Sequence, residues 1–270
     1  MKTRSWVRWV VAAVLALAVS AHQRRTGPTS AVHGKVDVEG TKVAFDLDRS
    51  YTNAKDAEMR IKVPDTGISG ALEFRRHPSP DSWTRQELRR EGDSLVGQVP
   101  RQPAAGKVMC QISLSKNVTA PVWLTREPIV IRFHNDVPFF PVVVPHVFVL
   151  VAAMVLAGRA ALEAWAKGPR TFLLSLLTVI SLTVGGLIFG PIMQKYAFGE
   201  YWTGWPFGQD LTDNKTAAAL LVWLVALWRL RAKPPARGWV MAAALVMLAV
   251  YLIPHSVLGS ELDYSQVPAP

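Results

Sequence analysis

The chain has 270 residues, of which 50% are hydrophobic, and its mean hydropathy is +0.19. It nevertheless carries 30 Lys and Arg against 20 Asp and Glu. Residues 22–140 hold 18 basic and 14 acidic residues, whereas residues 141–270 hold only nine and six. This uneven composition excludes a single soluble globule and a disordered chain. It predicts a charged, water-facing part joined to a membrane part.

The net charge of +10 invites a nucleic-acid-binding interpretation, but the position of the excess charge argues against it. Residues 1–9 contribute +3, residues 158–170 contribute +2 and residues 229–237 contribute +4, whereas residues 191–216 contribute −1 and residues 258–270 contribute −2. This alternation follows the positive-inside rule of membrane proteins. The basic character therefore indicates membrane orientation, and we expect no nucleic-acid partner.

Residues 1–21 are typical of a signal peptide, because a basic start precedes the apolar run Val10–Val19 and small residues follow it. An uncleaved membrane anchor is the alternative, since Trp6 and Trp9 suit a membrane interface. Both interpretations place His22 and the residues after it on the far side of the membrane.

Residues 31–135 predict an all-β domain, because short alternating runs are separated by turn residues. The expected strands are Val32–Val38, Lys42–Leu47, Glu58–Val63, Gly70–Arg76, Trp83–Leu88, Leu95–Val99, Gly106–Leu114, Val118–Leu124 and Ile129–Phe133. About nine strands at this spacing fit an immunoglobulin-like or fibronectin-like sandwich. We expect Trp83 and Trp123 in its core, and we expect Cys110, the only cysteine, to be a buried and unreactive thiol.

Residues 142–257 predict a four-helix transmembrane domain. The four apolar runs are Val142–Ala157, Phe172–Phe189, Ala217–Leu230 and Trp239–Ile253. The first helix is expected to continue beyond its apolar run, because Glu163 and Lys167 are four residues apart and can form an ion pair. Thr212 or Asp213 is the expected cap of the third helix.

Charge alternation also gives the path of the chain. The predicted sandwich lies outside, the four helices run in, out, in and out, and a short acidic tail, residues 258–270, ends outside. Gly186 and Gly190 form a GxxxG pattern in the second helix, which favours close helix packing.

Residues 191–216 join the second and third helices and predict an aromatic loop on the outer side. The residues expected to bind a partner are Tyr196, Phe198, Tyr201, Trp202, Trp205, Phe207, Asp210 and Asp213. One interpretation is an aromatic belt in the lipid headgroups. The other is a lid over a pocket, or a docking surface for another membrane subunit, because large rings carry much of the binding energy at interfaces.

Two histidines give a second signal. His146 lies near the outer end of the first helix, and His255 lies just past the outer end of the fourth. Imidazoles at facing helix ends can ligate the iron of haem b or another metal ion. The alternative is that each imidazole only bonds to the backbone or to headgroups.

The sequence thus predicts an exported all-β sandwich followed by a four-helix transmembrane bundle. We expect a bacterial inner-membrane protein with residues 22–140 on the periplasmic side. The favoured function is a non-catalytic membrane subunit or accessory factor that binds other membrane or periplasmic subunits. The alternative is a redox protein holding haem b or a metal through His146 and His255. An enzyme is less favoured, because the sequence has no identifiable nucleophile or acid–base pair.

Overall fold

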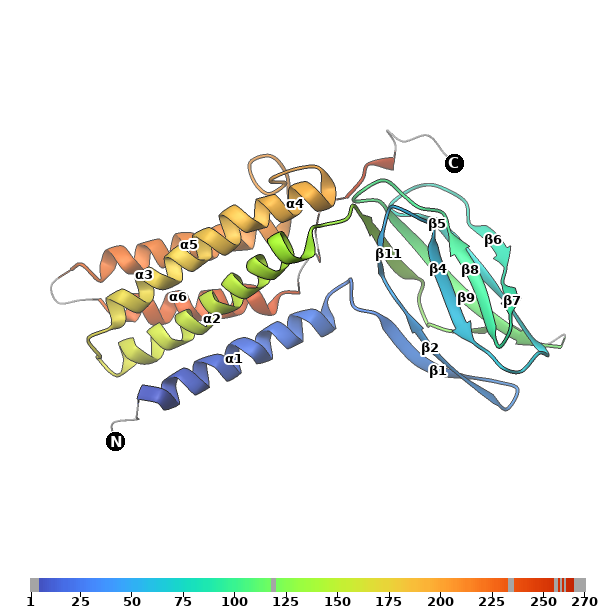
Figure 1. Cartoon of the computed structure of the whole chain (residues 1–270), viewed down its shortest axis with the longest axis horizontal. Helices are drawn as coiled ribbons and strands as arrows, with labels where there is room; N and C mark the ends of the chain where they lie inside the picture. Colours follow the sequence, from blue (N-terminus) through green and yellow to red (C-terminus); the bar gives the residue numbers. More distant parts are fainter. Residues whose placement is uncertain are drawn as a thin grey trace. The chain divides into compact units, whose positions relative to one another are not determined.

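The computed structural model describes residues 5–117, 120–232, 236–254, 257, 259 and 261–264. The chain contacts divide into two units (Figure 1). The helical unit comprises Met1–Gly27 and Val137–Ser260, and the sheet unit comprises Pro28–Asp136 and Glu261–Pro270. Each unit is therefore assembled from two separate parts of the chain.

The sheet unit is built from eleven described strands. They are β1 (Val32–Val38), β2 (Thr41–Leu47), β3 (Ser50–Thr52), β4 (Ala57–Lys62), β5 (Ile68–Arg76), β6 (Thr84–Glu87), β7 (Arg89–Glu91), β8 (Ser94–Val99), β9 (Lys107–Lys116), β10 (Val122–Trp123) and β11 (Ile129–His134). The strands missing from the sequence prediction, β3 and β7, have only three residues each. Runs this short carry almost no alternation to recognise.

The strands pair into three sheets. The largest has the order β3-β11-β9-β5-β6, with β10 also paired to β9, the second has the order β4-β8-β7, and β1 and β2 form a hairpin. The described pairs are antiparallel except β3 with β11, which is parallel. The longest pairing joins β5 to β9 from Ile68 opposite Lys116 to Arg76 opposite Val108.

One apolar core joins these sheets. On β4, Ala57, Met59 and Ile61 are buried while the residues between them are exposed, as expected for a strand with one covered face. They pack in the same cluster as Leu72 of β5 and Phe133 of β11. The alternation read from the sequence therefore sets which side chains form the core.

The expected burial of two tryptophans is wrong, whereas the expected burial of Cys110 is confirmed. Trp83 and Trp123 are 36% and 40% exposed, and the Trp83 ring lies 4.9 Å from the Arg75 guanidinium on the surface. Cys110 is fully buried on β9 with a free thiol. Aliphatic side chains, with Phe45 and Phe133, fill the core that the indoles were expected to fill.

The segment 261–264 packs on the sheet unit. The Tyr264 hydroxyl accepts a hydrogen bond from the Lys107 backbone N–H at 2.8 Å and donates one to the Lys107 carbonyl at 2.9 Å. The Lys107 ammonium forms an ion pair with Glu261, and the Tyr264 ring lies 5.0 Å from the Arg76 guanidinium. Burial raises the pKa of Tyr264 to about 12. Residues 261–264 are thus an integral part of the sheet unit.

In its described residues the helical unit contains five rods, each of them one uninterrupted run of helix. They are α1 (Ser5–Thr26), η1 with α2 (Phe139–Val143 and Val144–Trp165), α3 with η2 and α4 (Thr171–Leu182, Thr183–Phe189 and Gly190–Phe198), α5 (Leu211–Arg229) and α6 (Gly238–Leu252). The segments η1 and η2 are π-helical turns that continue into their neighbours.

Three of the described rods are long and apolar enough to cross a membrane: Ser5–Thr26, Phe139–Trp165 and Thr171–Phe198. Their length and composition indicate a membrane-associated protein. The predicted order of the elements was a sandwich followed by a helical bundle. This order is wrong in one respect, because the first element, α1, already belongs to the helical unit. The bundle therefore has five rods in its described part, where the sequence predicted four.

A buried ionic cluster joins α1 to α2. The Glu163 carboxylate accepts hydrogen bonds from Arg8 of α1 and from Arg159 of its own helix, each at 2.8 Å. Arg159 also donates to the Ser5 hydroxyl at 3.3 Å, and its guanidinium lies 5.4 Å from the Trp9 ring. The predicted partner of Glu163, Lys167, is instead exposed, because α2 ends at Trp165 and Lys167, with a φ of +53°, lies outside the helix.

Local sequence explains how two of the rods are positioned. α5 starts after Asp210, whose carboxylate accepts a hydrogen bond from the Thr212 N–H at 2.7 Å, so the cap is Asp210 and neither of the residues expected. At Gly186, an added Cβ would lie 2.5 Å from the Thr216 methyl group. The absence of a side chain at Gly186 therefore lets η2 approach α5, as the GxxxG pattern predicted.

Candidate functional site

The aromatic loop is shorter than the predicted segment 191–216, because α4 continues to Phe198. Gly199 ends that helix with a φ of +89°, a conformation that glycine adopts without strain. The irregular part then runs from Gly199 to Asp210 (Figure 1). We call Gly199–Asp210 and the flanking turns of α4 and α5 the outer loop.

The outer loop is held by side chains from the first turn of α5. The Asp213 carboxylate accepts hydrogen bonds from the backbone N–H groups of Thr203 at 2.8 Å and Gly204 at 3.0 Å. The Asn214 side-chain oxygen accepts one from the Trp205 N–H at 2.7 Å. Carboxylates that accept backbone N–H bonds fix a loop strongly, because charge-assisted bonds exceed neutral ones in strength.

A second set of bonds closes the loop from the α4 side. The Gln194 amide donates to the Thr203 hydroxyl at 2.5 Å, and the Asp210 N–H donates to the Thr203 carbonyl at 3.0 Å. Asp210 is buried and Asp213 is half-buried. The structure therefore places both carboxylates inside the loop, where they shape it.

The aromatic residues of the loop fall into two groups. Tyr196, Tyr201, Trp205 and Phe207 are exposed, and the last two are 75% and 82% exposed. Phe198 and Trp202 are half-buried, and the Trp202 indole N–H donates to the Trp205 carbonyl at 3.1 Å. Four large rings are thus presented outward on a backbone that is braced from within.

A shallow cleft of about 290 Å³ lies beside these rings, lined by Ile192, Lys195, Tyr196 and Tyr201. The Lys195 ammonium donates to the Gly199 carbonyl and lies 5.2 Å from the centre of the Tyr201 ring. This cation–π contact fixes the lysine over the aromatic face.

His146 has a backbone partner. Its Nδ1 lies 3.0 Å from the Gly185 carbonyl oxygen. Because a carbonyl only accepts, Nδ1 carries a proton and donates it to this bond. His255 lies outside the described residues, so its pairing with His146 stays a prediction. Within the described part of the chain, no group of three or more His, Cys, Asp or Glu residues is placed to hold a metal ion.

Sequence reasoning missed one buried cation near the outer loop. Lys215, in α5, is 5% exposed, and its ammonium donates to the Ile253 carbonyl just after α6 at 2.9 Å. A cation at a helix C-terminus satisfies a carbonyl that lacks a helical partner. The only signal in the sequence was a lysine directly before an apolar run.

No family model matches the chain, and no curated protein matches it significantly. The two units define a membrane-associated protein with a folded sheet unit, and its function has to be inferred from its own residues.

Proposed function

We propose that this protein is a non-catalytic integral membrane subunit or accessory factor. Its sheet unit and its outer loop bind a partner in a membrane complex. The observation that carries the proposal is the exposure of Tyr196, Tyr201, Trp205 and Phe207 on a loop braced by Asp213 and Asn214. Exposed aromatic rings on a rigid support are typical of interface hot spots.

The bracing bears on affinity. Binding costs free energy when flexible loops and side chains have to be ordered, on the order of 0.5–1.5 kcal/mol for each immobilised side chain. The Asp213 and Asn214 bonds order the loop backbone before a partner arrives. An aromatic belt that only rests in lipid headgroups gains nothing from such an ordered backbone, so the bracing favours docking over the belt.

We further propose a bacterial inner membrane with residues 22–140 on the periplasmic side. A bilayer cannot divide one folded sheet unit, so the sheets and residues 261–264 lie on the same side. Residues 137–260 between them must then cross an even number of times, and four rods meet that condition. The clusters of positive charge at residues 158–170 and 229–237 support a cytoplasmic position for the opposite end.

For the sheet unit we propose an immunoglobulin-like fold. The order β4-β8-β7 corresponds to strands B, E and D of that fold, and β5-β9-β11 corresponds to C, F and G. Antibody domains have a disulfide between their sheets and a tryptophan in the core. Here Cys110 is a free thiol and Trp83 is exposed, so neither feature is formed by these residues. An apolar core thus replaces the usual covalent link between sheets.

The test is purification of the tagged full chain in mild detergent, followed by mass spectrometry of stoichiometric partners. We expect a partner that is lost in the double variant Trp205→Ala/Phe207→Ala. The matched control is Trp6→Ala/Phe148→Ala, which removes two rings that are 61% and 72% exposed outside the loop. Retention of the partner by the loop variant, or its loss in both variants, contradicts the proposal.

The redox alternative has one supporting observation. A ligating histidine commonly donates its second ring N–H to a carbonyl, as His146 does to Gly185. An absorption spectrum of the purified protein tests it. A Soret band that disappears in His146→Ala and in His255→Ala supports haem b, whereas a protein without chromophore or stoichiometric metal contradicts the alternative.

A further inference from the structure

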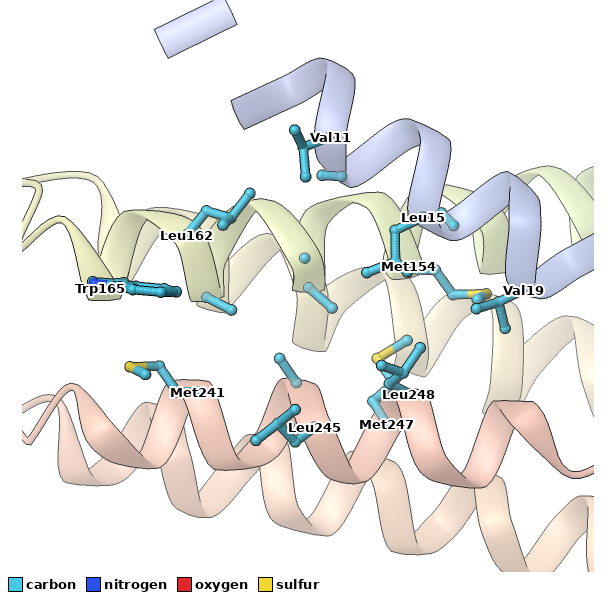
Figure 2. A pocket seen from close by; sticks show the side chains of 16 residues that line it. Val11, Leu15, Val19, Met154, Leu162, Trp165, Met241, Leu245, Met247 and Leu248 are labelled. Atoms are coloured by element: carbon cyan, nitrogen blue, oxygen red, sulfur yellow. The ribbon is translucent and has the colours of Figure 1, made fainter. Parts of the chain in front are cut away.

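An apolar groove of about 340 Å³ runs between α1, α2 and α6 (Figure 2). It is lined by 16 residues, all of them apolar, including Leu15 of α1, Met154 of α2 and Leu248 of α6. Trp165 and Met241 lie toward one end of the groove in Figure 2. The groove belongs entirely to the helical unit, so in a bilayer its surroundings are hydrocarbon.

The length of the groove matches one leaflet. On α2 it extends from Met154 to Trp165, twelve residues whose ends are about 16 Å apart along the helix. Half of a hydrocarbon core of about 30 Å is about 15 Å. The Trp165 end coincides with the end of α2, and the Trp165 indole is 74% exposed, which suits a membrane interface.

The lining of the groove suits a hydrocarbon chain. Ala157, Gly158 and Ala161 form its α2 side, where small residues leave the space open. Three methionines in the lining, including Met241 and Met247, supply flexible surfaces that adapt to an irregular chain.

The interfacial end of the groove is cationic. Arg8 lies one helical turn before Ala12 of the lining, Arg237 lies one turn before Met241, and Lys167 follows Trp165 by two residues. Residues four apart share a helix face, so both arginines lie on the faces that form the groove. Glu163 neutralises one of the two arginines that it contacts, which leaves this end positively charged.

We propose that this groove holds an acyl chain of an anionic phospholipid, drawn from the leaflet at the basic end of the helical unit. The chain fills the apolar groove from Trp165 toward Met154, and the headgroup lies among Arg8, Lys167 and Arg237. The site is independent of the outer loop and of its partner.

The experiment uses the full chain in vesicles of phosphatidylcholine and phosphatidylglycerol, with a photoactivatable diazirine on an acyl chain of either lipid. Cross-links are mapped by mass spectrometry of peptides. We expect labelling of residues 154–165 and 241–248 to exceed that of other lipid-facing segments several-fold, and to be stronger for phosphatidylglycerol. Ala161→Phe and, separately, Ala244→Leu fill the groove from α2 and from α6, and each should lower this labelling several-fold.

Ala218→Leu is the matched control, because Ala218 is an exposed residue of α5 outside the groove. It should leave labelling unchanged, and a melting curve confirms that each variant is folded. Uniform labelling of all lipid-facing segments overturns the proposal, as does labelling that both filled variants retain. Equal labelling by the two lipids overturns the anionic preference, and a cross-linked protein helix in the groove overturns the lipid as its occupant.

Discussion

At the scale of single residues, Cys110 is the most sharply defined group of the sheet unit. It is fully buried on β9, and burial raises its thiol pKa to about 12. At pH 8 only about 10⁻⁴ of such a thiol is ionised, and the thiolate is the reactive form. We expect maleimide to leave Cys110 unmodified in the folded protein at pH 8 and to modify it after denaturation, as measured by intact mass.

Thr84→Cys supplies the control for this experiment, because Thr84 is exposed on the edge strand β6. That variant should gain one adduct under native conditions. Rapid modification of the unaltered protein at pH 8 would contradict the burial of Cys110 on β9.

Asp213 allows a second test at the same scale. Asp213→Ala leaves the N–H groups of Thr203 and Gly204 without their acceptor, which costs about 1–3 kcal/mol for each buried donor left unpaired. We expect the loop to be cleaved faster by a protease and to lose its partner, while the sheet unit unfolds as before. Limited proteolysis with mass spectrometry measures the rate at residues 199–210.

Glu200→Gln is the comparison for that variant, since Glu200 is an exposed acidic residue of the same loop. Cleavage should stay at the original rate. Equal rates of protease cleavage in Asp213→Ala and Glu200→Gln would show that the Asp213 carboxylate does not brace the loop.

At the scale of elements, the ionic cluster links α1 to α2 within the bundle. Glu163 is 4% exposed and bonds to Arg8 across the two helices. This contact, together with the burial of Ala12, Ala16 and Val19, favours a retained membrane anchor over a removable signal peptide. We expect the intact mass of the purified protein to include residues 1–21, and a mass that lacks them would contradict the retained anchor.

Removing the carboxylate should weaken the same contact. Glu163→Ala leaves the Arg8 and Arg159 guanidiniums without their shared counter-ion, and breaking a buried pair in this way costs about 3–5 kcal/mol. Denaturant titration in detergent should show the loss. Glu127→Ala removes a carboxylate that is exposed on the sheet unit and should change stability by less than about 0.5 kcal/mol.

The sequence alone predicted well the strands that have one buried and one exposed face. β1 was predicted residue for residue, and β5 and β9 within two residues at each end, because alternation reports burial directly. The packing of Tyr264 on the sheet unit could not be predicted, because Tyr264 and Lys107 lie 157 residues apart and no local pattern links them.

The candidate site was predicted in part. Aromatic density located the outer loop, but it did not show that Asp213 turns inward. The α1–α2 cluster was missed because Glu163 was assigned to the nearer Lys167, and only packing of the bundle brings Arg8 to it. Local spacing indicates local pairs, whereas buried ionic clusters depend on tertiary contacts.

At the scale of the whole molecule, the proposed sidedness can be tested with cysteines introduced for labelling by a membrane-impermeant reagent. We expect Lys42→Cys in β2 and Glu261→Cys in the tail to be labelled from the periplasmic side. Lys167→Cys should be labelled only after the membrane is opened. Labelling of Lys167→Cys in intact spheroplasts would reverse the proposed orientation.

The pairing of Tyr264 with Lys107 also bears on the order in which the protein is made. Strand β9 is translated well before the residues that cover Lys107, because α2 to α6 lie between them in the chain. The sheet unit therefore reaches its final packing only after α6 has been synthesised.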